Sequence, residues 1–241
     1  MSSDALSALR RDLVAANRIL FDQDILDAFG HVSARDPVHP ERYYMARSMA
    51  PALVEEGDIL EFNLDSNCVS DPGARTYLER FIHGEIYKAR PDVGAVVHSH
   101  AAAVLPFAVS SAVKLCAVCH MSGFLAQPAP VFEIRDHAGD GSDLLIRSPG
   151  LGARLAECLG AHPLVLMRGH GMTVVGADVR QAVFRAVYAS ANARVQAAAL
   201  QLGEVIYLTE AEARAADAAN AGQADRAWDL WARRVERDAP T

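Results

Sequence analysis

A β-hairpin predicted at Pro163–Gly176 (PLVLMRGHGMTVVG) restricts the fold of this chain more than any other segment. Two runs of strand-forming residues flank Arg168-Gly169-His170-Gly171, and glycine readily adopts the backbone angles that a tight turn requires. The segment therefore predicts two antiparallel strands with His170 in the turn between them, where no bulky neighbour covers its ring.

Short strands and intervening helices are predicted on both sides of the hairpin. Apolar or β-branched runs bounded by Pro and Gly predict strands at 31–35, 42–47, 59–64, 93–100, 115–121 and 130–134. Helical periodicity predicts a first helix that ends at about 21–27 and further helices at 74–88, 101–109, 149–159, 178–202, 209–219 and 225–237. Short strands with helices between and after them, without a repeat or a linker, indicate one α/β domain over residues 1–241.

The composition excludes several classes of protein. Apolar residues make up 51% of the 241 residues and charged residues 22%, which is incompatible with intrinsic disorder. The chain has 23 Lys and Arg against 30 Asp and Glu, a net charge of −7, so broad binding to nucleic acid or to an anionic membrane is not expected. Four cysteines are too few for a disulfide scaffold, and the N-terminus has no signal-peptide pattern, so a cytoplasmic location is expected.

Three of the nine histidines form a candidate metal site. His98 and His100 are two residues apart at the end of a predicted strand, so their rings project from the same face of the sheet. His170 lies between two glycines in the predicted turn. Three such imidazoles can bind one divalent ion and leave coordination positions open for a substrate. The alternative is that all three are surface histidines without a ligand.

Glu79 adds a carboxylate to this set. On the helix predicted at 74–88, Glu79 and His83 lie four residues apart on one face, with Arg75 one turn earlier. A carboxylate beside a divalent ion acts as a fourth ligand or as a proton shuttle. The spacing by itself favours the alternative of an ordinary residue pair on a solvated helix face.

His120 is a further candidate for a substrate-binding residue. It is the one acidic or basic side chain between Lys114 and Glu133. It also ends the string Cys116-Ala-Val-Cys119-His120, which matches the haem attachment motif of c-type cytochromes. An apolar run in a chain without an export signal argues against haem, so we retain the pocket role alone.

Three segments together resemble the class II aldolase/adducin family over nearly the whole chain. They are GHVSAR at Gly30–Arg35, ERFIHGEIYKARPDVGAVVHSHA at Glu79–Ala101 and RGHGMTVVG at Arg168–Gly176, in the family's order and spacing. The resemblance implies a three-layer α/β/α sandwich around a mostly antiparallel sheet, and a homotetramer with active sites between subunits. It also implies that His98, His100 and His170 bind the metal and that Glu79 binds it or transfers a proton.

The chain departs from the sugar-phosphate aldolases of that family where they bind phosphate. His31 replaces an asparagine, Ser48-Met49 replaces a Ser-Gly pair, and Tyr77-Leu78 replaces a Ser-Ser pair. Exchanging two small hydroxyl groups for Tyr and Leu removes hydrogen-bond donors and fills space, so a phosphate dianion would lose most of its contacts. Arg47 and His31 are expected to bind a planar carboxylate instead, with Ser48 and Tyr77 as further substrate-binding residues.

This pattern resembles the branch of the family that contains non-oxidative decarboxylases of hydroxylated aromatic acids, such as 3-hydroxy-2-methylpyridine-4,5-dicarboxylate and dihydroxyphthalate decarboxylases. Decarboxylation leaves an electron pair on carbon, and a divalent ion bound to the neighbouring oxygen would stabilise that charge. The expected cofactor is one divalent ion per subunit, Zn²⁺ or Mn²⁺, with Fe²⁺ or Co²⁺ also compatible. Glu79 is the first candidate for the acid that protonates the ring carbon, followed by His31 and His83.

Other functions fit the same resemblance. A class II aldolase or epimerase acting on a sugar phosphate would use the same metal, and an adducin-like scaffold would need no catalysis. A mononuclear iron oxygenase is a further alternative, because three histidines with open positions also suit iron.

The C-terminal segment, 222–241, is expected to form a helix on which Trp228 and Trp231 make an apolar ridge. The ridge either packs on its own subunit or closes over an active site.

Overall fold

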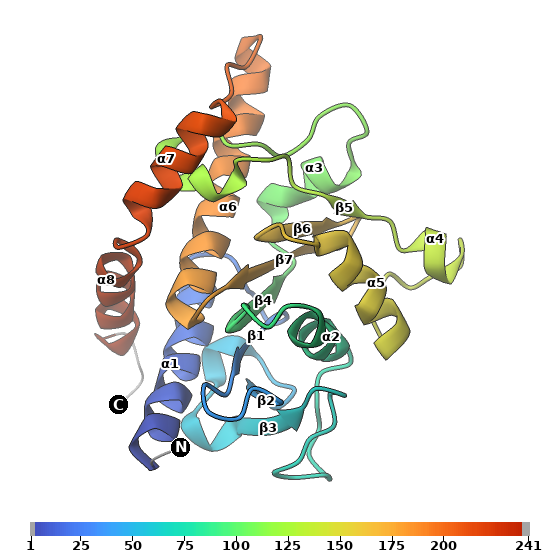
Figure 1. Cartoon of the computed structure of the whole chain (residues 1–241), viewed down its shortest axis with the longest axis vertical. Coiled ribbons are helices and arrows are strands. Elements are labelled where there is room, and N and C mark those ends of the chain that lie inside the picture. The colour runs from blue at the N-terminus through green and yellow to red at the C-terminus, as the bar shows by residue number, and fades with distance from the viewer. Residues whose placement is uncertain (1–2, 238–241) are drawn as a thin grey trace.

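The computed structural model describes residues 3–237, and Figure 1 shows a central β-sheet with helices on both sides. The helices are α1 (Ser3–Asp22), α2 (Phe81–Ala89), α3 (Leu105–Val109), α4 (Arg135–Ala138), α5 (Pro149–Leu159), α6 (Val179–Leu202), α7 (Glu210–Asn220) and α8 (Ala224–Arg237). The strands are β1 (His31–Arg35), β2 (Arg42–Ala46), β3 (Ile59–Asn63), β4 (Ala95–Ser99), β5 (Val131–Phe132), β6 (Leu164–Met167) and β7 (Gly171–Gly176). None of the described helices is both long enough and apolar enough to cross a membrane.

The strands of the described chain form one sheet in the order β3-β2-β1-β4-β7-β6-β5. Every neighbouring pair is antiparallel except β5 and β6, which run parallel. The prediction of an α/β/α sandwich around a mostly antiparallel sheet is therefore confirmed. Because β4 lies between β1 and β7, the strand that carries His98 is at the centre of the sheet.

The hairpin predicted at Pro163–Gly176 is formed by β6 and β7. Its turn contains Gly169 with a φ of +66°, a backbone conformation that glycine adopts without strain. The helix that follows also begins as predicted, because the Asp178 side chain accepts a hydrogen bond from the Gln181 N–H and caps α6.

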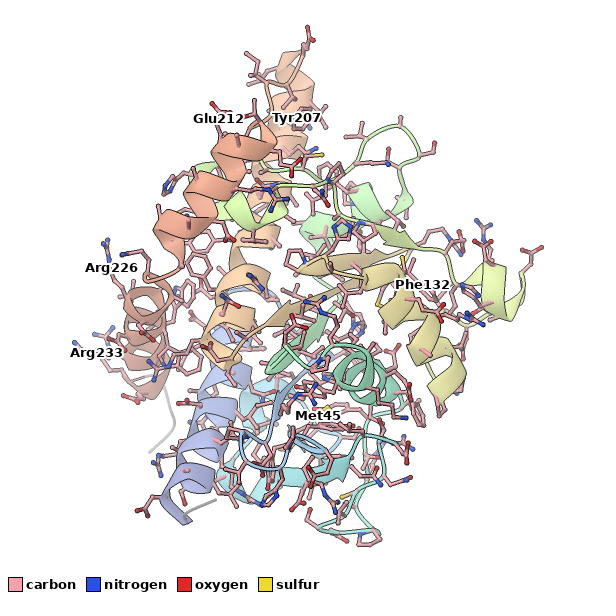
Figure 2. All side chains as sticks on the ribbon, viewed as in Figure 1. Met45, Phe132, Tyr207, Glu212, Arg226 and Arg233 are labelled. Atoms are coloured by element: carbon pink, nitrogen blue, oxygen red, sulfur yellow. The ribbon has the colours of Figure 1, made fainter. Side chains whose placement is uncertain are left out.

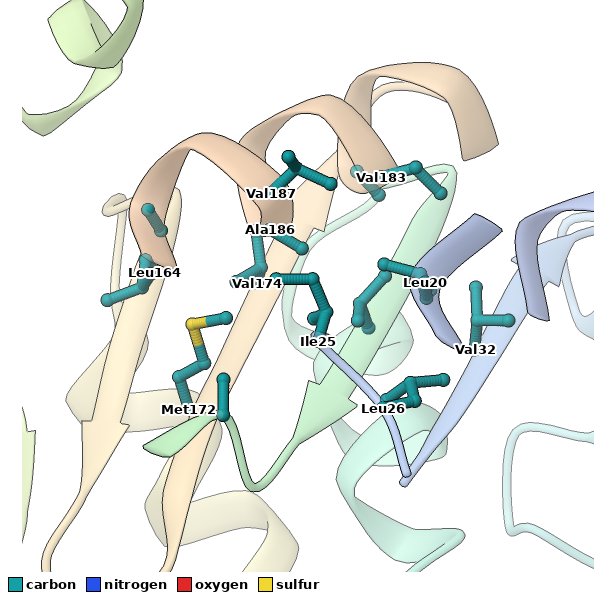
Figure 3. Close-up of a cluster of buried hydrophobic side chains, with 14 of the residues drawn as sticks. Leu20, Ile25, Leu26, Val32, Leu164, Met172, Val174, Val183, Ala186 and Val187 are labelled. Atoms are coloured by element: carbon teal, nitrogen blue, oxygen red, sulfur yellow. The ribbon is translucent and has the colours of Figure 1, made fainter. Parts of the chain in front are cut away.

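Two apolar clusters join the three layers. On one face of the sheet, α1, α6 and α8 cover a cluster in which Leu20, Val32 and Val174 pack together with other aliphatic side chains (Figure 3). On the other face, α2 and α5 cover a second cluster. Val97 belongs to the first cluster and Val96 to the second, since successive residues of a strand point to opposite faces.

The helix predicted at 74–88 is wrong in its first half, because α2 begins later and an irregular loop precedes it. The polar groups of this loop bond to a neighbouring segment instead of along a helix. The Tyr77 hydroxyl, for example, donates to Met49 O at 2.7 Å. Glu79 therefore lies before the helix, and the predicted helical pairing of Glu79 with His83 is wrong.

The strand predicted at 115–121 is also wrong, because this segment pairs with side chains of α6 and not with another strand. Gln196 Oε1 accepts from Cys116 N–H at 3.0 Å, and Asn192 Oδ1 accepts from Val118 N–H at 2.9 Å. Asn192 Nδ2 also donates to Cys116 O at 2.7 Å. Two buried amides thus satisfy a backbone whose apolar composition is typical of a strand.

The C-terminal helix predicted at 225–237 is observed as α8, and residues 238–241 lie outside the described part of the chain. Trp228 and Trp231 are both buried against this chain's own helices, whereas Leu230 is exposed. Arg226 and Arg233 project from the outer side of α8 (Figure 2). The role of this helix in covering an active site stays a prediction.

Candidate metal centre and substrate cavity

His98 lies in the middle of a row of polar side chains that crosses three neighbouring strands. His31 on β1 is opposite His98 on β4, which in turn is opposite Thr173 on β7. The ring centroids of His31 and His98 are 5.1 Å apart, and His98 Nδ1 is 3.3 Å from Thr173 Oγ1. All three side chains are buried, so they need protein or ligand partners in place of water.

The hairpin turn brings His170 to the end of β4. His170 Nε2 is 3.0 Å from His100 Nε2, and the two rings stack with their centroids 4.9 Å apart. This approach depends on Gly171, because a Cβ atom at that position would collide with Ser99 O. The glycine after the histidine is therefore required by the contact between the hairpin and β4, whereas the turn itself depends on Gly169.

Glu79 completes the group from the loop before α2. Its Oε2 is 3.5 Å from His98 Nε2 and 3.4 Å from His170 Nε2. One ligand atom from each of Glu79, His98, His100 and His170 lies within 4.8 Å of the other three. We call these four residues the four-donor cluster. The structure thus brings together all four residues that the sequence predicted as metal ligands.

Hydrogen bonds on the outer sides of the rings fix which nitrogens face the cluster. His170 Nδ1 donates to Leu144 O at 2.9 Å, which leaves Nε2 unprotonated and able to bind a metal. The Thr173 hydroxyl donates to Met167 Sδ at 3.5 Å, so its oxygen accepts from His98 Nδ1. His98 Nε2 is then left buried with no hydrogen-bond partner in the described chain, which suits an imidazole that binds a metal.

The charges in the cluster favour an anionic carboxylate beside neutral imidazole. Burial acts to raise the pKa of Glu79, but the neighbouring His98 and His170 outweigh it and hold the pKa well below its ordinary value. Burial lowers the pKa of His100 to about 4. Three nitrogen donors and one ionised carboxylate fit a divalent ion such as zinc, manganese, iron or cobalt.

A backbone segment at 144–146 holds two members of the cluster. Leu144 O accepts from His170 Nδ1, and Ile146 N–H donates to Glu79 Oε1 at 2.9 Å. Leu144 has a φ of +69°, which residues with a side chain rarely adopt. No sequence pattern predicts this segment, because the groups involved are backbone N–H and C=O groups that any residue supplies.

A cavity of about 670 Å³ opens beside Glu79 and His100. Of the predicted substrate-binding residues, His31, Ser48 and Tyr77 line it. Most of the remaining wall is apolar and consists of Ala28, Phe29, Met49, Ala50, Leu78 and Leu145. The cavity therefore offers a flat, apolar ring a surface to pack on, with Glu79 and His100 of the four-donor cluster in its wall.

Arg75 is the arginine that lines this cavity. Its guanidinium has no ion-pair partner within residues 3–237, and its carbonyl accepts from Ser48 N–H at 2.8 Å, which ties two loops of the cavity wall together. The structure does not bring Arg47 to this cavity, because Arg47 Nε binds Asp58 Oδ1 at 2.6 Å. The helix predicted at 74–88 placed Arg75 one turn before Glu79, so its position in a cavity wall was not predicted.

Two other predicted residues do not line the cavity. His83 is fully buried behind His31, with its Nε2 2.6 Å from His31 Nδ1, and burial lowers the pKa of His83 to about 3. His120 lies in a different hollow with Tyr188 and Trp231, which shares no lining residue with the cavity beside the four-donor cluster.

Known proteins resemble this chain in sequence and in fold. Residues 11–197 match the profile of the class II aldolase and adducin N-terminal domain. The chain is 37% identical to the decarboxylase tropJ of Talaromyces stipitatus, over 94% of this chain and 93% of that protein. It is 30% identical to a 3,4-dihydroxyphthalate decarboxylase of a Terrabacter species, over 78% of this chain and 80% of that protein.

A solved structure shows the same fold. The L-fuculose 1-phosphate aldolase of Glaciozyma antarctica superposes with a TM-score of 0.77, at 23% identity, over 97% of this chain and 90% of that one.

Proposed function

Because the chain belongs to the class II aldolase and adducin family, we propose that it is a divalent-metal-dependent, non-oxidative decarboxylase of a hydroxylated aromatic acid. In reaction class it is a carbon–carbon lyase of the carboxy-lyase type. The observation that carries the proposal is that Glu79 and His100 of the four-donor cluster line a largely apolar cavity that Arg75 also lines.

Glu79 is proposed to move the proton in this reaction. A divalent ion held by the four-donor cluster would supply a Lewis acid for the substrate's hydroxyl oxygen. Glu79 is ionised and lines the cavity, and a bound ion would make that hydroxyl group acidic enough for this carboxylate to accept its proton. It then returns the proton to the ring carbon that loses carbon dioxide, which balances the proton count without an external acid.

Arg75 and Ser48 are proposed to hold the carboxylate of the substrate. A guanidinium group binds a carboxylate through two parallel hydrogen bonds, and the Ser48 hydroxyl lines the same cavity. Tyr77 is proposed to contact the aromatic ring with its own ring, since its hydroxyl is already bonded to Met49 O. His31 faces the same space from β1.

A sugar phosphate fits this cavity less well. Tyr77 and Leu78 occupy the wall where the sequence comparison with aldolases places two serines, and both line the cavity. A phosphate dianion needs several hydrogen-bond donors, and these two side chains offer no free hydroxyl group.

The test is a substrate panel assayed with purified enzyme before and after removal of metal by a chelator. Hydroxylated benzoates, phthalates and pyridine carboxylates are compared with sugar phosphates, and released carbon dioxide is measured. We expect carbon dioxide from at least one hydroxylated aromatic acid, lost on chelation and restored by zinc or manganese. Cleavage of sugar phosphates in preference, or full activity in the chelated protein, would refute the proposal.

A homo-oligomer, with four subunits as the family resemblance implies, is also proposed. Leu202 is 91% exposed and Ile206 is 93% exposed at the connection between α6 and α7. Apolar side chains this exposed are typical of surfaces that contact another subunit. Native mass spectrometry of the purified protein measures the number of subunits directly.

A further inference from the structure

A continuous line of buried polar groups leads from the cavity wall into the core. His31 Nδ1 is 2.6 Å from His83 Nε2, and His83 Nδ1 is 2.6 Å from Ser33 Oγ. Ser33 Oγ is in turn 2.7 Å from the Tyr87 hydroxyl oxygen. No member of this line is more than 4% exposed, so the groups must satisfy one another. We call these four residues the His31–Tyr87 chain.

The His31–Tyr87 chain arises from two spacings in the sequence, one on a strand and one on a helix. His31 and Ser33 are two residues apart on β1, so both point to the same face of the sheet. His83 and Tyr87 are four residues apart on α2, so both lie on the helix face that packs on that side of the sheet. One strand and one helix therefore align four polar groups without help from a loop.

Tyr87 sets the direction of the hydrogen bonds. Burial raises the pKa of its phenol, so the hydroxyl group keeps its proton in the core. The Tyr87 proton needs an acceptor of its own, and within the described chain that acceptor is Ser33 Oγ. Tyr87 therefore donates to Ser33.

The remaining directions follow from that first bond. Ser33 donates its own proton to His83 Nδ1, and His83 donates from Nε2 to His31 Nδ1. His83 is neutral, because burial lowers its pKa to about 3. The reverse direction would leave the buried Tyr87 hydroxyl without an acceptor. The population with the reversed hydrogen bonds should therefore be smaller by about tenfold or more.

We propose that Tyr87, Ser33 and His83 are positioning residues that fix His31 in the tautomer with its proton on Nε2. The His31 ring lines the cavity and its Nδ1 points away from it, so this tautomer presents an N–H donor to the bound ligand. The identity of that ligand, an anionic oxygen of the aromatic acid, rests on the proposed function. The tautomer of His31 does not depend on the proposed function.

The fixed tautomer also separates His31 from the four-donor cluster. The His31 and His98 ring centroids are 5.1 Å apart, yet His31 contributes no ligand atom to the cluster. A protonated Nε2 has no lone pair to offer. His31 thus stabilises negative charge on the substrate beside the metal site instead of acting as a further ligand.

Nitrogen-15 NMR of the zinc-loaded enzyme tests the tautomer directly, because long-range correlations distinguish protonated from unprotonated ring nitrogens. His31 is assigned by the loss of its signals in His31→Asn. We expect one tautomer, with Nε2 protonated and Nδ1 bare. A His31 ring protonated on Nδ1, or an even mixture of the two tautomers, would overturn the inference.

Variants then test the chain. Ser33→Ala should mix the two tautomers and lower kcat by about tenfold, with the zinc content unchanged. Ser33→Thr keeps the hydroxyl group and should restore the single tautomer and the wild-type kcat. The matched control is Tyr43→Phe, which removes a buried phenol hydroxyl from the same apolar cluster but outside the chain. It should leave the tautomer and kcat unchanged.

The outcomes separate this inference from the proposed function. A single Nε2–H tautomer in Ser33→Ala, or the same loss of kcat in Tyr43→Phe, would contradict the positioning role of the His31–Tyr87 chain. If the predicted tautomer is found but the protein decarboxylates no aromatic acid, the proposed function is refuted. The inference about the His31–Tyr87 chain then still holds.

Discussion

His31 and His98 lie opposite each other across the β1–β4 ladder, and their Nδ1 atoms bond in different directions. His98 Nδ1 bonds to Thr173 within the sheet, whereas His31 Nδ1 bonds to His83 on α2. One ring therefore belongs to the four-donor cluster and the other to the cavity wall, although they are neighbours. Substitutions at these two positions should affect metal binding and substrate turnover separately.

His98→Ala should abolish metal binding. His98 Nε2 is buried without a partner and lies 3.5 Å from Glu79 Oε2, so its loss removes a central donor of the cluster. Loss of a metal-orienting group typically costs 10–100-fold in affinity, and loss of a ligand should cost at least about 100-fold. Elemental analysis of the dialysed protein measures the effect. His39→Ala removes an exposed histidine and should retain the metal; equal metal content in the two variants would contradict the assignment.

Arg75→Ala should raise KM for the aromatic acid by about 10–100-fold, because the carboxylate loses a charge-assisted pair of hydrogen bonds. Metal content should not change. Arg47→Ala is the matched comparison, and it should have a smaller effect because Arg47 already binds Asp58. Steady-state kinetics on both variants decides between the two arginines. A larger rise in KM for Arg47→Ala would restore the role that the sequence analysis assigned to it.

Much of the fold could be predicted from local sequence patterns. The hairpin at 163–176, the helix at 149–159 and the strand at 31–35 each carry a local signal that no tertiary contact overrides. The segment at 115–121 shows where such patterns fail. Its composition is that of a strand, but Asn192 and Gln196 bind its backbone, and their role depends on a helix about 75 residues away in sequence.

The candidate site could likewise be predicted only where it depends on local sequence patterns. Its histidines stand out because their spacing and flanking glycines are visible in the sequence. The carbonyl of Leu144 and the N–H of Ile146 could not be predicted, because any residue supplies them. Arg75 was missed because the helix expected around it is a loop that turns into the cavity. The sequence shows that His31 and Ser33 share a strand face and that His83 and Tyr87 share a helix face. It does not show that these two faces meet, because that depends on the contact between β1 and α2.

Gly171→Ala should disrupt the four-donor cluster while leaving its four residues in place. A methyl group there would collide with Ser99 O, so β7 or the hairpin must move away from β4. We expect at least about a tenfold loss of metal affinity and a destabilisation of about 1–3 kcal/mol, the usual cost of overpacking. Gly57→Ala is the control, because a Cβ there meets no atom within 4 Å. Metal titration and urea unfolding measure both effects, and equal behaviour of the two variants would count against the close approach.

The free energy of unfolding of the metal-free protein should fall as the pH falls from about 6.5 toward 3. His83 is buried and neutral with a pKa of about 3, whereas an unfolded histidine has a pKa of about 6.5. Between these values the unfolded chain binds a proton that the native chain does not. Acid therefore favours unfolding, by about 1.4 kcal/mol per pH unit for this one residue.

His83→Gln isolates this contribution, because it removes the titrating ring while the other buried groups stay. Urea unfolding of both proteins at pH 7, 6 and 5 gives the slope of the unfolding free energy against pH. Below pH 6.5 the slope of the variant should be smaller than that of the wild type by the equivalent of about one proton. Its overall stability can be lower without affecting this comparison, since the slopes alone are compared. Parallel slopes would mean that His83 takes up a proton in the native protein, and the directions assigned to the His31–Tyr87 chain would then be wrong.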